Sequence, residues 1–153
     1  MLSKLLSSQI IIYHCILFFS FSLSVNYLSY VCFHLTLIYL FFYFFHFFLI
    51  FLTFLYGIFF DIFLVDNISP HLITYLIFVV LFYFAKKYLF NLSSRKIAYI
   101  MILLTILMFV SEALIANLLF NYPINYENFL WISFSFIIIF YPTLVLFSKI
   151  DKL

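Results

Sequence analysis

The sequence predicts an all-α integral membrane protein, a single transmembrane domain of six helices with both termini in the cytoplasm. Three observations lead to this fold class. Of the 153 residues, 69% are hydrophobic, and only 8% are charged, whereas a water-soluble domain is about one quarter charged. Charged residues are also absent from three long runs, residues 5–60, 67–85 and 128–148. Because about 20 apolar residues span a bilayer as a helix, most of the chain is expected within a membrane, which excludes a soluble enzyme, a nucleic-acid-binding protein and a disordered tail.

The first charge-free run, of 56 residues, accounts for the first three predicted helices. As one helix it would be about 84 Å long, nearly three times the thickness of the hydrocarbon layer, so it must fold back on itself. Three crossings of about 19 residues fit this length. We place them at residues 6–23, 27–45 and 47–65, with His46 as the break in the aromatic segment between the second and the third.

The other three predicted helices are bounded by charged and turn residues. Asp66 and Asn67 mark the end of the third helix, and the fourth is predicted at residues 68–84. A basic segment separates the fourth helix from the fifth, at residues 97–119. A second polar segment precedes the sixth helix, at residues 128–147.

The first predicted helix has an alternative interpretation as a cleaved secretory signal peptide. Lys4 precedes the apolar stretch, and Ser20 and Ser22 resemble the small residues of a cleavage site. The segment lacks an Ala-x-Ala pattern and is not followed by a polar mature start. We therefore expect it to be retained as a membrane helix.

The distribution of basic residues predicts the orientation, because Lys and Arg collect on the cytoplasmic side of a membrane. With six crossings, every Lys and Arg lies on one side, whereas residues 66–70 and 121–127, expected on the other side, contain none. Both termini are therefore expected in the cytoplasm, and four basic residues are expected in a cytoplasmic loop between the fourth and fifth helices. These four are Lys86, Lys87, Arg95 and Lys96, and the other three are Lys4, Lys149 and Lys152.

Asp61 is one of two acidic residues expected within the membrane, where an ionisable side chain costs about 2.5–3.5 kcal/mol. Gly57 lies one turn earlier on the same helical face, so a neighbouring backbone can approach closely there. Two interpretations of Asp61 stay open. In the structural one its carboxylate caps or bonds the outer loop around Asp66 and Asn67, and in the functional one it forms a partner contact or an ion site.

Glu112, in the fifth predicted helix, is the more deeply placed acidic residue. Three interpretations stay open: a neutral, hydrogen-bonded side chain facing the interior, a pair with His14 or His34 of another helix, and a role in moving protons or substrates. The sequence supplies no series of polar groups for a proton path. No nucleophile or metal cluster accompanies Asp61 and Glu112, so the chain is not predicted to be an enzyme.

No metal or cofactor site is predicted from the sequence. Gly57 is the only glycine, whereas phosphate-binding and dinucleotide-binding loops need two or more. The four histidines lack the spacing of metal ligands, and we expect His46 and His71 at the membrane surfaces. Both cysteines are expected to be packed thiols. Pro142 lies within the last predicted helix and is expected to kink it, because proline removes one backbone hydrogen bond.

Several features follow one another in an order that is typical of a known family of membrane proteins. The segment FLYGIFFDIFLVDNISPHLITYLIF, residues 54–78, has Gly57 followed four residues later by Asp61, then a short outer loop and an apolar helix. The basic segment YFAKKYLFNLSSRK then leads into a helix with the acidic Glu112, and Pro142 in the last helix precedes a short basic tail. Over about residues 25–152, the chain resembles the rod shape-determining protein MreD family.

The resemblance implies a non-catalytic subunit of the bacterial cell-elongation machinery in the inner membrane, a scaffold that regulates cell shape and peptidoglycan synthesis. Besides membrane lipid, it implies three partners: MreC, the filament protein MreB and the elongation peptidoglycan synthases. The cytoplasmic basic loop would then meet the filament protein or anionic lipid, or would serve only to fix the topology. Two positions, Val65 and Ser69, depart from the family, which usually has glycines in this loop.

The alternative function is that of a substrate-binding membrane subunit of a small vitamin or ion transporter. Such subunits also tend to be six-helix proteins of this size. The first predicted helix lacks the Ala-x-x-x-Ala surface with which those subunits dock their transport partner. The outer loops are also too short and apolar to form an obvious lid over a ligand.

Overall fold

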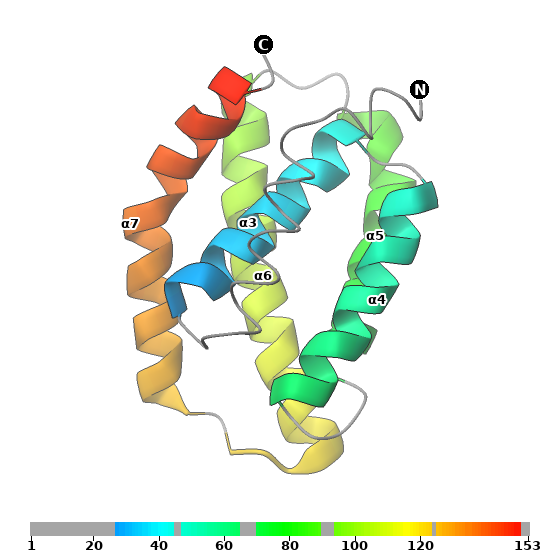
Figure 1. The fold of residues 1–153 in the computed structure, drawn as a ribbon, viewed down its shortest axis with the longest axis vertical. Coiled ribbons are helices and arrows are strands. Elements are labelled where there is room, and N and C mark those ends of the chain that lie inside the picture. Colours follow the sequence, from blue (N-terminus) through cyan, green and yellow to red (C-terminus); the bar gives the residue numbers. More distant parts are fainter. Residues whose placement is uncertain (1–26, 45–46, 65–69, 90–93, 124, 151–153) are drawn as a thin grey trace. The chain divides into compact units, whose positions relative to one another are not determined.

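The computed structural model describes residues 27–44, 47–64, 70–89, 94–123 and 125–150, and these residues form five α-helices and no strand (Figure 1). The all-α prediction is therefore confirmed for the described residues. The first predicted helix, residues 6–23, lies outside them. The helices are α3 (Tyr27–Phe44), α4 (Phe47–Leu64), α5 (Pro70–Leu89), α6 (Ser94–Phe120) and α7 (Tyr126–Ile150).

The structure corrects the prediction that the four basic residues lie in a loop. Lys86 and Lys87 belong to the last turn of α5, and Arg95 and Lys96 belong to the first turn of α6. The predicted helices end where the apolar residues end, but Lys and Arg are good helix formers. An apolar run therefore marks the part of a helix that suits a membrane, while the hydrogen-bonded helix continues beyond it.

The described residues fall into two compact units. The first lies within Phe41–Ile124 and contains α4, α5 and α6, with α5 packed against both other helices; we call it the α4–α6 unit. The second lies within Met1–Leu40 and Asn125–Leu153 and contains most of α3 together with α7; we call it the α3–α7 unit.

Asparagine residues mark where α6 ends and where α7 begins. Asn121 has a left-handed backbone with φ of 55°, and its N–H donates to the carbonyl of Asn117 at 3.0 Å. This bond is the one that defines an αL C-cap, and the N–H of Tyr122 also donates to the carbonyl of Ala116, at 3.4 Å. The side chain of Asn125 then caps α7, because its Oδ1 accepts the N–H of Glu127 at 3.0 Å.

In the α3–α7 unit, side-chain hydrogen bonds connect the two helices. The hydroxyl of Tyr27 donates to Oδ1 of Asn128 at 2.7 Å. Cys32 is a free, buried thiol, and the buried hydroxyl of Thr143 hydrogen-bonds to it. Pro142, next to Thr143, lies inside α7, where it leaves one backbone carbonyl without its helical donor.

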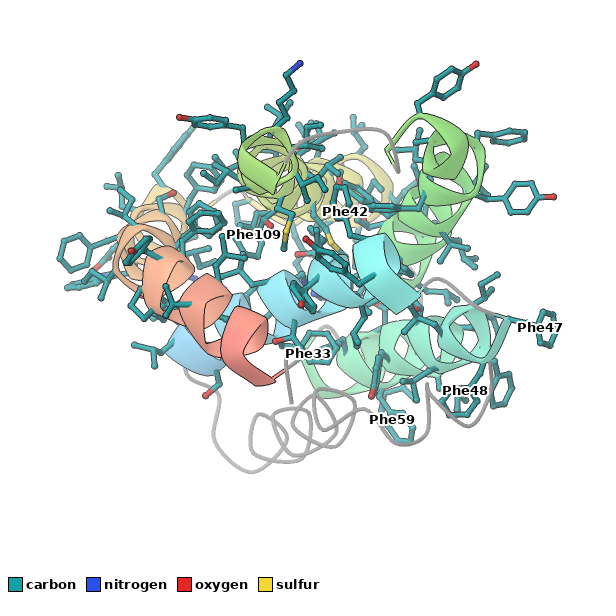
Figure 2. All side chains as sticks on the ribbon, turned by 90° about the horizontal axis from the view of Figure 1, so that it is seen from above. Phe33, Phe42, Phe47, Phe48, Phe59 and Phe109 are labelled. Atoms are coloured by element: carbon teal, nitrogen blue, oxygen red, sulfur yellow. The ribbon has the colours of Figure 1, made fainter. Side chains whose placement is uncertain are left out.

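Large apolar side chains lie on the surface of the described residues as well as in their core. On the surface, Phe47 of α4 is 78% exposed and Ile137 of α7 is 74% exposed. Figure 2 shows Phe47, Phe48 and Phe59 pointing outward from α4, whereas Phe109 of α6 is buried. Several polar side chains are buried among the apolar ones, including Asp61, His71 and Glu112.

Two of the described helices are long and apolar enough to cross a membrane. They are the stretches Lys96–Phe120 of α6 and Tyr126–Val145 of α7. Shorter apolar stretches occupy Tyr27–Tyr43 of α3, Phe47–Ile62 of α4 and Pro70–Ala85 of α5.

Candidate functional site

The site begins with Gly57, where α4 and α5 touch through their backbones. A Cβ atom added to Gly57 would lie 2.7 Å from Cα of Leu72 and 3.2 Å from its backbone nitrogen. Carbon atoms in contact are normally about 3.5–4.0 Å apart, so no side chain fits between the two helices here. The neighbouring backbone that the sequence analysis expected at Gly57 is that of Leu72.

One turn further along α4, the carboxylate of Asp61 binds the start of α5. Its Oδ1 accepts the backbone N–H of His71 at 2.8 Å, and its Oδ2 accepts the backbone N–H of Leu72 at 3.0 Å. The first N–H groups of a helix have no partner within the helix, and its N-terminal dipole favours a negative charge. Asp61 therefore caps α5 from a different helix, with its own side chain fully buried.

The local sequence of α5 suits this capping arrangement. Pro70 is the first residue of the helix, a position where proline is favoured because its missing N–H would have no helical partner anyway. His71 and Leu72 supply the next two N–H groups, and both are bonded by Asp61. The hydroxyl of Thr74 donates to the carbonyl of Pro70 at 2.7 Å, which completes the first turn.

His71 also binds Asp61 through its side chain, with Nδ1 at 2.9 Å from Oδ1. A proton on Nδ1 makes this contact a hydrogen bond, and a fully protonated ring makes it an ion pair. His71 is 7% exposed, so its side chain is buried within the protein, and its expected level at a membrane surface stays a prediction. Its ring packs beside Phe60 and Tyr75, with ring centres 5.7 Å and 6.3 Å apart.

Tyr75 extends the polar group from Asp61 toward α6. Its side chain is fully buried, and it lies within electrostatic range of both Glu112 and Asp61. Glu112 of α6 is itself 6% exposed, in agreement with an inward-facing position. Polar groups of α4, α5 and α6 thus lie in one region of the α4–α6 unit. We call them the buried polar cluster, which consists of Asp61, His71, Tyr75 and Glu112.

Sequence reasoning singled out the two carboxylates of the buried polar cluster but missed His71 and Tyr75. One signal was present, because His71 and Tyr75 are four residues apart and therefore share a helical face. His71 also follows Pro70 directly, at the point where a helix start requires capping groups. Which of the histidines would meet Asp61 depended on which helix packs beside α4.

The buried threonines of the same unit satisfy their own hydroxyl groups. Thr53 donates to the carbonyl of Leu49 at 2.7 Å, and Thr105 donates to that of Met101 at 2.8 Å. In each case the acceptor is four residues earlier in the same helix, a common arrangement for a hydroxyl without water nearby. These hydroxyl groups therefore need no bound ligand.

Chemically, the buried polar cluster joins helices. Its best-defined part, Asp61 with His71 and Leu72, uses both carboxylate oxygens for protein donors. Among the described residues, no three His, Cys, Asp or Glu side chains gather as metal ligands. Pro142 lies in the other unit, and the basic residues Lys86 to Lys96 lie at the ends of α5 and α6 that are remote from the start of α5.

The Gly57–Asp61 arrangement and the order of helices around it can be compared with those of known proteins. Neither a protein-family model, nor a curated protein, nor a solved structure matches this chain.

Proposed function

We propose that this chain is a non-catalytic, multi-pass subunit of the bacterial inner membrane that scaffolds the cell-elongation complex, as the MreD family does. In this proposal it crosses the membrane six times, with both termini in the cytoplasm. It regulates cell shape and peptidoglycan synthesis by holding MreC, MreB and the elongation peptidoglycan synthases together. Membrane lipid surrounds the remaining surface.

The membrane location is supported by the large apolar side chains on the surface of the described helices. Phe47 and Phe51 on α4 and Leu103 on α6 are 78%, 54% and 65% exposed, and such a surface is stable in lipid but not in water.

The observation that carries the scaffold proposal is the Gly57–Asp61 contact with α5. These are the residues on which the resemblance to the MreD family rests, and both act in joining α4 to α5. The two oxygens of Asp61 bind the chain's own backbone. A membrane protein whose polar residues fasten its own helices together is suited to presenting a rigid apolar surface to neighbouring proteins.

The test is affinity purification of the tagged chain from native membranes in mild detergent, with co-purifying proteins and small molecules identified together. We expect MreC or an elongation peptidoglycan synthase to be recovered without a bound metabolite. Recovery of an ATPase module or of a tightly held vitamin would refute the scaffold proposal and support the transporter subunit.

A pair of variants in α4 makes this test specific. Gly57→Leu should reduce partner recovery and rod shape, because the added side chain separates α4 from α5. Phe54→Leu is the matched control, since it introduces the same residue on the same helix at a position that is 39% exposed. The control should retain both partner recovery and cell shape at similar membrane levels of protein.

A further inference from the structure

We propose that the α4–α6 unit binds the headgroups of anionic lipids at the end where α5 stops and α6 starts. Lys86 and Lys87 lie in the last turn of α5, and Arg95 and Lys96 lie in the first turn of α6. These two helices pack against each other and are joined by a short connection, so the four basic residues occupy adjoining helix ends. We call these four residues the basic end.

The charge of the basic end is not balanced within its own stretch of sequence. No Asp or Glu occurs between residues 67 and 111, a stretch that includes all of α5 and the first half of α6. The acidic residues described in the same unit are Asp61 and Glu112, and both are buried. Asp61 is bonded at the start of α5, which is the opposite end of that helix from Lys86 and Lys87.

Helix stability does not account for the positions of Arg95 and Lys96. The N-terminus of a helix carries a partial positive charge, which favours acidic residues and disfavours basic ones. The first turn of α6 contains Arg95 and Lys96 and no acidic residue. An anionic group beside this turn offsets the repulsion between the basic side chains and the helix dipole, whereas water alone does not offset it.

Exposed aromatic side chains place the basic end at the level of lipid headgroups. Tyr88 of α5 is 75% exposed and Tyr99 of α6 is 73% exposed, and each lies within one turn of the basic residues on its helix. Tyrosines are enriched at membrane–water interfaces, where the ring meets the acyl chains and the hydroxyl meets water. Basic residues close to such tyrosines in the sequence suit a lipid, which carries its phosphate next to an apolar chain. We therefore assign the basic end to anionic lipid and not to a cytoplasmic protein.

This inference rests on the membrane location in the proposed function, but it does not depend on the cell-elongation partners. The lipid inference and the proposed function can therefore be refuted independently of each other. Loss of lipid selectivity leaves the partner recovery of the wild-type chain unchanged, and a failure to recover elongation proteins leaves the lipid measurement unchanged.

The experiment measures which lipids stay with the full-length protein. The purified chain is placed in nanodiscs that contain an excess of phosphatidylcholine over phosphatidylglycerol, and the retained lipids are counted by native mass spectrometry after gentle release. Wild-type protein should retain phosphatidylglycerol preferentially. The preference should fall by about fivefold for each basic residue that is neutralised, and salt should weaken it in the wild type.

Two double variants provide the comparison. Lys86→Gln with Lys87→Gln removes two charges from the basic end, and Lys149→Gln with Lys152→Gln removes two charges from the C-terminal segment. Both doubles remove charges that the proposed topology places in the cytoplasm, so they have equal effects on membrane orientation. The first double should lose selectivity, and the second should keep it.

Three results would overturn the inference. They are an absence of phosphatidylglycerol enrichment in the wild type, equal losses in the two doubles, and enrichment that is insensitive to salt. A double that fails to fold leaves the salt dependence of the wild type as the deciding measurement. If the basic end instead serves a cytoplasmic protein, the first double loses that protein while its lipid selectivity stays at the wild-type value, which also refutes the lipid assignment.

Discussion

Replacing Gly57 with alanine is the most direct perturbation of the contact between α4 and α5. In an exposed helix the substitution would stabilise the protein by about 1 kcal/mol, because alanine has the higher helix propensity. Here the new Cβ would lie 2.7 Å from Cα of Leu72, a backbone atom that cannot rotate away. The two effects have opposite signs, so the outcome distinguishes them.

The size of the destabilisation by Gly57→Ala follows from how far α4 and α5 must separate. Restoring a carbon–carbon contact of about 3.5 Å requires a shift of roughly 1 Å between α4 and Leu72. The same Leu72 donates its N–H to Asp61 at 3.0 Å, and a shift of this size lengthens that bond toward about 4 Å, beyond hydrogen-bond range. Overpacking costs about 1–3 kcal/mol and a bond to a charged group is worth about 1.5–3 kcal/mol. After the gain in propensity is subtracted, Gly57→Ala should destabilise the protein by about 2–4 kcal/mol.

The assay is reversible unfolding in mixed micelles, in which the fraction folded is followed as the denaturing detergent is increased. Phe54→Ala, three residues earlier and on the surface, is the control and should change the unfolding free energy little. The combination of Gly57→Ala with Leu72→Ala should not restore stability, because the nearest atom is the Cα that alanine retains. A Gly57→Ala protein that is more stable than the wild type would refute the backbone contact, and rescue by Leu72→Ala would show that the contact involves only the side chain.

Three further predictions concern the cap of α5, the end of α6 and the topology. Asp61→Ala should cost about 3 kcal/mol, because two buried N–H groups lose a charged acceptor. Asp61→Asn should cost about half as much, since it keeps one acceptor oxygen; equal unfolding free energies for these two variants would contradict the capping role. Asn121→Ala should cost about 1 kcal/mol through its left-handed backbone, while Asn121→Gly should stay close to the wild type, and the reverse order in the same assay would contradict the αL C-cap. In a background without native cysteines, Leu92→Cys should react with an impermeant thiol reagent only from the cytoplasm and Pro123→Cys only from outside; reaction of both from one side would refute the six-helix topology.

The order and the approximate bounds of the described helices could be predicted from charge and length. α3 and α4 follow from one charge-free run that is too long for a single helix, and α7 follows from another. The errors lie at the ends of α5 and α6, where basic residues continue the helix. Charge determines which residues suit a membrane, whereas backbone hydrogen bonding determines where a helix stops, and the two limits differ by about one turn.

The buried polar cluster could be predicted only in part. Gly57 and Asp61 stand out because a lone glycine and a carboxylate in an apolar helix both require an explanation. Their partners His71, Leu72 and Tyr75 could not be assigned, because they belong to a different helix. In helices that are apolar on nearly every side, no hydrophobic stripe indicates which face packs inward.

The sequence by itself therefore determined that the described chain is helical, which segments are apolar and where a close contact on α4 would occur. Those properties depend on residues that are neighbours along the chain. Only the tertiary structure decided that Asp61 caps α5, that His71 is buried beside it, and that Tyr75 lies within electrostatic range of two carboxylates. These facts depend on the packing of α4, α5 and α6, in which a difference of one residue in register would bring another N–H group to the carboxylate.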